Sequence, residues 1–328
     1  MRTSCTRALA TVMWVLLFAA LAGQATCWAL SHSATEREGS STGRLSGHEL
    51  LRIGEIHDHQ HHFLETLTYY QLALSRFREQ KQSRGIATAL VKIARVHEQQ
   101  GTLQKAYTCL QEALPLVARS PDRAAHAGTL LVMGRVGARL GHRDEARDAL
   151  SQALALFKQV KDSRGRSEAL IQLGLLQVDE GPVEAGLSSL QQAGHDARAR
   201  HDTEQQLVAL IALGDAHWLL DRMTDARALY SEGLRLAETE HHVPSEAKLR
   251  LRLAQIDSAD GHLNQGIVLG KRALLLSQTL RDNAAEAVAW SLLADLYHKM
   301  EREGEAEEAD QRALAIYRGR EIKVHGTP

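Results

Sequence analysis

Small residues recur in three columns with a period of forty along this sequence, and this repeat is the strongest constraint on the fold. Twenty of the 21 positions are Gly or Ala, although 47 Ala and 24 Gly among 328 residues would place only about five there by chance. The columns are Gly54, Ala94, Gly134, Gly174, Gly214, Ala254 and Ala294; Thr66, Ala106, Ala146, Gly186, Ala226, Gly266 and Ala306; and Ala73, Ala113, Ala153, Ala193, Gly233, Ala273 and Ala313. The sequence therefore predicts seven copies of one structural unit.

Each unit reads as two antiparallel helices. The second and third columns are seven residues apart, which is two turns of an α-helix, so they share one face and let that helix approach a partner closely. In the third unit we expect a first helix over Ala124–Leu140, a turn at Gly141 in the left-handed conformation, and a second helix from about His142. Pro115 falls inside the expected second helix of the second unit and predicts a kink or an early end there.

Composition supports helices and excludes several other classes. Aromatic residues make up only 4% of the chain and there are five prolines, which favours helices packed through small side chains over a β-rich fold. The formal charge of −1 provides no basic footprint for nucleic acid. Cys5, Cys27 and Cys109 are too few and too scattered for a disulfide framework.

The first 29 residues have the pattern of an export signal. Arg2 and Arg7 precede the apolar run Ala8–Leu21, and small residues follow it. An uncleaved membrane anchor over Ala8–Leu30 is the main alternative, and lipid attachment at Cys27 is a weaker one. We expect an exported protein, periplasmic or secreted, that is either released or held at the membrane by this segment alone.

The remaining boundaries follow from the repeats. Residues 30–46 are polar, rich in Ser, Thr and Gly, and predict a flexible linker. Residues 47–318 hold the seven units, and residues 319–328 form a short tail.

The repeats resemble the tetratricopeptide repeat (TPR) family in its forty-residue form. The family's small residue in the first helix matches Gly134 and its equivalents, and its alanine pair in the second helix matches Ala146 and Ala153. The Trp and the closing Pro of the shorter repeat form are missing, and Arg250 stands where five other units have Leu. The resemblance implies an all-α fold, an α-solenoid of seven helix-turn-helix repeats that stack into a right-handed superhelix with a continuous core.

In this family ligands usually lie in a concave groove lined by the first helices. Carried over residue by residue, the first groove position of the seven units is His48, Thr88, Gly128, Glu168, Val208, Lys248 and Val288, and the second is Leu51, Val91, Leu131, Ile171, Ile211, Leu251 and Ser291. A basic stretch beside an apolar patch suggests a peptide with an acid near an apolar anchor. The predicted partner-binding residues are Arg95, Leu131, Arg135, Arg139, Ile171, Leu175, Val178, Ile211, Asp215, Trp218 and Gln255. The alternative is that the apolar members pack between neighbouring repeats.

No motif for catalysis or cofactor binding accompanies the repeats. The sequence has no Gly-rich phosphate loop, no HExxH and no Cys-x-x-Cys. His57 and His61 lie one helical turn apart, but two imidazoles without a third ligand do not predict a metal site. We therefore expect a non-enzymatic, monomeric scaffold or adaptor without cofactor or metal that binds a protein or peptide. A self-assembling structural solenoid and a sensory or regulatory TPR module acting with a separate effector remain alternatives.

Overall fold

The structure, a computed structural model, describes residues 45–60 and 62–325, with side chains up to residue 318. The predicted export signal, residues 1–29, and nearly all of the predicted linker lie outside these residues. The described residues form fourteen α-helices and no strand. The helices are α2 (Gly47–His59), α3 (Phe63–Glu79), α4 (Ser83–Gln99), α5 (Leu103–Ala118), α6 (Arg123–Leu140), α7 (Arg143–Val160), α8 (Ser163–Glu180), α9 (Val183–Ala199), α10 (Thr203–Leu219), α11 (Met223–Thr239), α12 (Val243–Ala259), α13 (Leu263–Thr279), α14 (Asn283–Lys299) and α15 (Glu303–His325).

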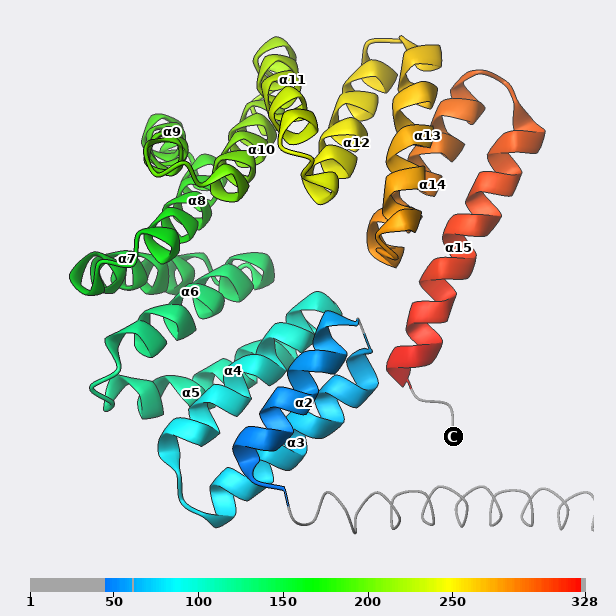
Figure 1. Ribbon diagram of the computed structural model, residues 1–328. Coiled ribbons are helices and arrows are strands. Elements are labelled where there is room, and N and C mark those ends of the chain that lie inside the picture. Colours follow the sequence, from blue (N-terminus) through cyan, green and yellow to red (C-terminus); the bar gives the residue numbers. More distant parts are fainter. Residues whose placement is uncertain (1–44, 61, 326–328) are drawn as a thin grey trace, which may run out of the picture. The chain divides into compact units, whose positions relative to one another are not determined.

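Consecutive helices pair into seven hairpins, as the period predicted. The chain divides between Lys81 and Gln82 into two compact units, which are described separately. The first is the N-terminal hairpin, α2 and α3, and the second is the main array, α4 to α15. Within the main array the hairpins follow one another along a curved path (Figure 1). The fold is therefore an all-α solenoid.

The glycines of the first column are packing positions, because a larger side chain would collide with the other helix of the same hairpin. A Cβ atom added to Gly214 on α10 would lie 2.3 Å from Cε1 of Tyr230 on α11, and one added to Gly54 on α2 would lie 2.4 Å from Cε1 of Tyr70 on α3. Where the first position is Ala, as at Ala94 on α4, the position sixteen residues later carries a smaller or differently shaped residue, here Leu110. Gly54 with Tyr70 and Gly214 with Tyr230 are thus matched pairs within their hairpins.

The turns within the hairpins use the left-handed conformation that the glycines predicted. Gly141 has a φ of 83° and follows the last residue of α6. Asp221 and Glu301 occupy the same turn position with a φ of 58° each, although a side chain is disfavoured there. The turns between hairpins repeat this geometry, at Lys81, Lys161, His201, His241 and Arg281.

Two second helices extend further than the sequence predicted. Pro115 does not end its helix, because α5 continues to Ala118. Pro115 and Gln111, whose carbonyl loses its helical partner, are both exposed, so water can bond that carbonyl. At the carboxyl end α15 extends to His325, so the segment predicted as a tail from residue 319 begins as helix.

Arg250 is accommodated without an apolar partner. Its guanidinium lies 2.6 Å from Glu238 and 3.0 Å from Glu246, so two carboxylates neutralise a charge in a position that other repeats fill with Leu.

Among the described residues no helix is both long enough and apolar enough to cross a membrane.

Candidate functional site

The first helices of the main array share one surface, called here the inner face. α4, α6, α8, α10 and α12 each contact the first helix of the next hairpin, and α14 is the last in this series. Figure 1 shows α6, α8 and α10 on the inner side of the curve, with α7, α9 and α11 on its outer side. The inner face therefore presents residues from successive repeats side by side.

Arg135, which we had predicted to bind a partner, is held by two carboxylates of the protein itself. Its Nε and Nη2 atoms donate to the two Glu98 carboxylate oxygens at 2.7 and 2.8 Å, and its Nη1 donates to Glu168 at 2.8 Å. The Arg135 side chain is 26% exposed and that of Glu98 is 10% exposed. Three of the five N–H groups of the guanidinium are used and two carboxylates balance its charge, so Arg135 ties α6 to α4 and α8.

The prediction of an exposed apolar patch on this surface was wrong as well. Leu131, Ile171, Val178 and Ile211 are only 3%, 2%, 6% and 4% exposed, so they do not form a surface. Ile171 and Val178 pack in one cluster of the core between hairpins, and Ile211 packs in the next. The alternative interpretation, packing between neighbouring repeats, applies to these four residues, because the helices of adjacent hairpins close over them.

The other predicted residues in this region are partly accessible. Leu175 and Trp218 are half-buried against those same clusters. Arg95 is exposed, and Arg139 is half-exposed with Nη1 3.7 Å from Glu98.

Asp215 and Gln255, the remaining two predicted residues, belong to a polar network that joins α10, α11 and α12. Arg252 lies 2.8 Å from Asp215 through Nε and donates from Nη1 to Gln255 at 3.1 Å. The Tyr230 hydroxyl donates to Asp215 at 2.7 Å. Burial, followed by the bond to Asp215, raises the pKa of Tyr230, so the hydroxyl stays protonated and remains a donor.

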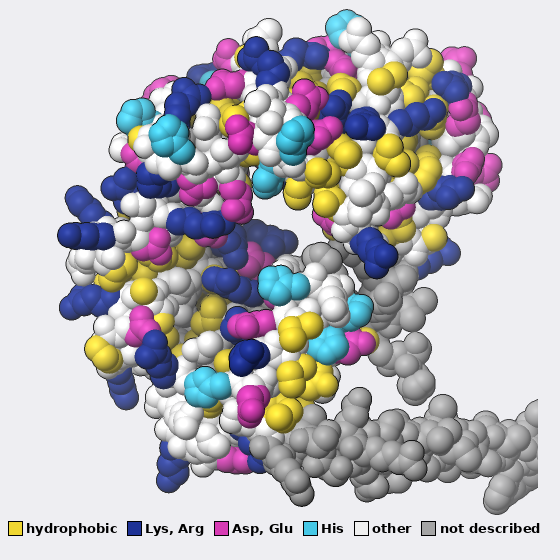
Figure 2. Space-filling view, viewed as in Figure 1, with side chains coloured by type: hydrophobic (Ala, Val, Ile, Leu, Met, Phe, Trp, Pro, Cys, Tyr) yellow, Lys and Arg dark blue, Asp and Glu magenta, His cyan; other side chains and the backbone are white. Residues whose placement is uncertain are grey.

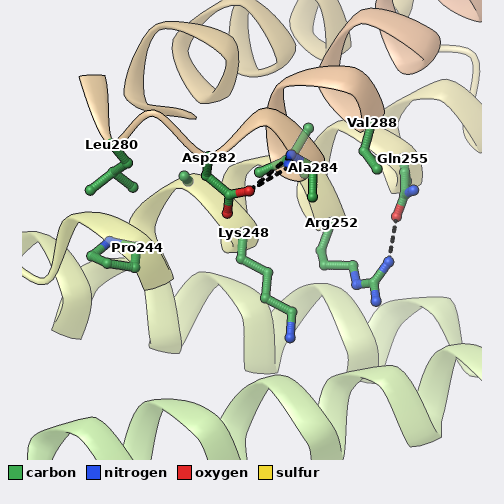
Figure 3. Close-up of a pocket in the computed structure, with 11 residues that line it drawn as sticks. Pro244, Lys248, Arg252, Gln255, Leu280, Asp282, Ala284 and Val288 are labelled. Carbon is green, nitrogen blue, oxygen red and sulfur yellow. Dashed lines mark hydrogen bonds between the residues drawn. The ribbon is translucent and has the colours of Figure 1, made fainter. Parts of the chain in front are cut away.

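A pocket of about 450 Å³ opens between α12 and α14 beside this network. Its apolar lining includes Leu251, which is 7% exposed, and Val288, which is 42% exposed. Figure 3 shows Lys248 and Arg252 projecting from α12 on the side away from Asp282, Ala284 and Val288. In Figure 2 hydrophobic side chains and cationic side chains gather over α12 to α14. The lining residues are Pro244, Ala247, Lys248, Leu251, Arg252, Gln255, Leu280, Asp282, Ala284, Ala285 and Val288.

The charged groups around the pocket differ in whether other groups of the protein already bind them. Asp282 caps α14, because its Oδ1 accepts from the amides of Ala284 and Ala285 at 3.0 and 3.1 Å. Arg252 is neutralised by Asp215. Lys248 is exposed. Its pKa is lowered overall, chiefly through desolvation by the surrounding protein, with Asp215 opposing this shift and Arg252 adding to it. Lys248 is therefore the cation of this pocket that a ligand can reach.

The sequence predicted only some of the residues that line the pocket. Lys248, Leu251, Gln255 and Val288 occupy groove positions given by the repeat pattern, but nothing in that pattern favoured the sixth and seventh repeats. Leu280 and Asp282 precede α14, and Ala284 lies in its first turn. These three residues lie outside the groove positions. Within the part of the chain that the structure describes, no three His, Cys, Asp or Glu side chains gather as a potential metal site.

Comparison with known proteins agrees with this geometry. Residues 85–159 match the family model of the tetratricopeptide repeat. The paired helices continue with the same period from α2 to α15. The family match supports tetratricopeptide repeats in residues 85–159, and the other described helices share the same paired architecture. No curated protein sequence matches it.

Several solved structures share the fold at low sequence identity. A Rap protein complexed with Competence and Sporulation Factor has a TM-score of 0.64 at 17% identity, with 88% of this chain and 80% of that chain covered. The apo form of RapI has a TM-score of 0.61 at 13% identity, with 84% and 98% covered. A Rap conjugation gene regulator in complex with the Phr* peptide has a TM-score of 0.61 at 15% identity, with 83% and 73% covered. These likenesses establish a TPR solenoid architecture.

Proposed function

We propose that the protein is a non-enzymatic scaffold that binds a peptide segment of a partner on its inner face. The observation that carries this proposal is the pocket between α12 and α14, which combines the buried apolar side chain of Leu251, the exposed apolar side chain of Val288 and an accessible cation at Lys248. Concave sites with an apolar lining and a few polar groups are the usual form of binding sites in proteins. The Phr* peptide complex of one structural neighbour supports a peptide as the ligand class.

The binding site in this proposal differs from the one the sequence favoured. Arg135 and the buried apolar residues around Ile171 hold the repeats together, whereas the pocket supplies the contacts to the partner. The protein acts as a monomer and catalyses no reaction itself. Light scattering at several concentrations tests the monomer, and a mass that grows with concentration would favour self-assembly.

A selection of random twelve-residue peptides displayed on phage, with the full chain as the target, tests the binding function. The enriched peptides are then measured by isothermal titration against Val288→Glu and Val268→Glu. Val288 lines the pocket, whereas Val268 is a 68% exposed valine on α13 outside it, so it is the matched control. We expect Val288→Glu to weaken binding by about tenfold or more and Val268→Glu to leave it unchanged. Failure to enrich any peptide, or equal effects of both substitutions, would contradict the proposal.

The scaffold works outside the cytoplasm in this proposal. Support comes from the sequence, where Arg2 and Arg7 precede the apolar run Ala8–Leu21. Fusion of residues 1–46 to alkaline phosphatase, which is active only after export, should give active enzyme. Sequencing of the mature amino terminus then distinguishes a cleaved signal from a retained anchor, and an inactive fusion would place the protein in the cytoplasm.

A further inference from the structure

Three residues at the same repeat position form a line across the last three first helices. Val208 on α10, Lys248 on α12 and Val288 on α14 are separated by forty residues each. Val208 is 38% exposed, Val288 is 42% exposed, and Lys248 is exposed as well. We call these three residues the stripe.

Contacts within the main array place the members of the stripe next to one another. Lys248 and Val288 line the same pocket. Val208 lies two helical turns before Asp215 on α10, so the two share a face. Asp215 binds Arg252, which lies one turn after Lys248 on α12. The face of α10 that carries Val208 therefore turns toward the face of α12 that carries Lys248.

The charge of the stripe is open to a partner. The pocket's other cation, Arg252, is bound to Asp215, and Oδ1 of Asp282 accepts from the amides of Ala284 and Ala285 in α14. A partner that covers Lys248 with an apolar group would leave an ammonium group desolvated and unpaired, which is costly. A carboxylate at this point compensates the charge, and apolar groups suit the valines on either side.

The spacing of the helices determines the spacing of the partner's side chains. Packed helices lie about 8–10 Å apart. A polyproline II segment rises about 3.1 Å per residue with three residues per turn, so every third side chain points the same way at intervals of about 9 Å. A β-strand would turn every third side chain to the opposite side. An extended segment of the polyproline II type thus matches the stripe.

We propose that the stripe binds an extended peptide segment that presents an acidic side chain to Lys248 and apolar side chains, three residues before and three residues after it, to Val208 and Val288. This inference rests on the proposed function and specifies its ligand. The apolar side chain at Val288 is the larger one, because the pocket with Leu251 and Leu280 lies beside that valine.

A designed probe tests the inference by fluorescence anisotropy on the full chain. The probe is a fluorescein-labelled peptide of nine residues with leucine at positions two and eight, glutamate at position five, proline at three and six, and serine elsewhere. We expect saturable binding that falls about tenfold when the glutamate becomes lysine or moves by one position. Lys248→Glu should reverse the preference, so that the lysine peptide binds better than the glutamate peptide.

Two further variants make the test decisive. Lys248→Gln removes the charge without reversing it and should make the two peptides bind alike. Lys105→Glu changes an exposed lysine on α5, away from the stripe, and should leave the preference for glutamate unchanged. Circular dichroism confirms that each variant is folded.

The possible outcomes separate this inference from the proposed function. Binding of the probe with the same affinity by Lys248→Glu, or with the same affinity after the glutamate is moved, would overturn the inference. Enrichment of unrelated peptides in the phage selection, without binding of the probe, would overturn the inference and leave the proposed function standing. No binding of the probe and no enrichment of any peptide would overturn both.

Discussion

The guanidinium of Arg135 on α6 and the carboxylate of Glu98 on α4 form a two-pronged ion pair, with distances of 2.7 and 2.8 Å. Glu168 on α8 accepts a third bond from the same guanidinium at 2.8 Å. One side chain therefore connects the first helices of three successive hairpins. Its role is to hold those helices in place, and substitutions there act first on stability.

Arg135→Met should lower the free energy of unfolding by about 2 kcal/mol, because Glu98 is nearly buried and is left with only the longer contact to Arg139 at 3.7 Å. Adding Glu98→Gln to this variant should recover part of the loss. Arg95→Met, at the same repeat position but exposed, should change stability by less than about 0.5 kcal/mol. Urea denaturation of the four proteins measures these differences, and an equal effect of Arg95→Met and Arg135→Met would contradict the assignment.

Gly214→Ala should destabilise the protein by about 1–3 kcal/mol, since the new methyl group would lie within 2.3 Å of the Tyr230 ring. Tyr230→Leu introduced together with it should restore much of the stability, because Ala94 and Leu110 already form this pair in the second repeat. Gly128→Ala, in the interior of α6 with nothing within 4 Å of the added carbon, is the control and should stabilise by up to about 1 kcal/mol. Thermal melts that rank the two alanine variants in the reverse order would show that the matched pair is wrong.

Glu301→Gly should stabilise the last hairpin by up to about 1 kcal/mol, because Glu301 has a φ of 58°, where a side chain is disfavoured and glycine is not. The converse change, Gly261→Ala at the equivalent turn, should cost about 1–2 kcal/mol. Denaturation midpoints of both variants check the pair. A loss of stability in Glu301→Gly would mean that the turn does not have this conformation in solution.

The last hairpin should be more stable at low pH. His298 on α14 lies 3.2 Å from Asp310 through Nε2 and 3.2 Å from Glu303 through Nδ1. The bond to Asp310 is the main cause that raises the pKa of His298 above its ordinary value of 6.5, and the carboxylate of Glu303 adds to it. Because the folded state binds the proton more tightly, the stabilisation is complete below pH 6.5 and is lost as the pH rises through the raised pKa.

Hydrogen exchange of α15 measured across this pH range tests the His298 contact. Opening of the helix should become easier with rising pH in the natural sequence. His298→Gln should abolish the dependence, since it keeps a polar side chain and removes the titrating group. A pH dependence that persists in this variant would assign the effect to another group.

The sequence predicted the fold in detail because one repeated pattern determines all of the hairpins. The period of forty placed the hairpins, the small columns placed the close contacts, and Gly141 marked the end of α6. The site was harder to predict. Whether Ile171 is a surface or a core residue depends on how closely the neighbouring hairpins approach, which one repeat read alone does not encode.

The ion pairs between repeats show the same limit. Glu98 and Arg135 are 37 residues apart, as are Asp215 and Arg252, so partners come from different columns of the repeat, three residues short of one period. A column-by-column comparison does not place them together. Arg135 therefore resembled a free basic residue in the sequence, and its neutral environment emerged only from the packing of α4, α6 and α8.

The matched pairs of Gly54 with Tyr70 and of Gly214 with Tyr230 have a consequence for how such a chain can change its length. Both members of each pair lie within one hairpin, so duplication or loss of a whole hairpin keeps each tyrosine with the glycine that makes room for it. A genetic exchange with its breakpoint in the turn at Asp221 would separate α10 from α11. Tyr230 would then pack against a first helix that has alanine in place of Gly214, or Gly214 would face a smaller residue and leave a cavity. Recombination between copies should therefore be tolerated at the joints between hairpins and selected against inside them.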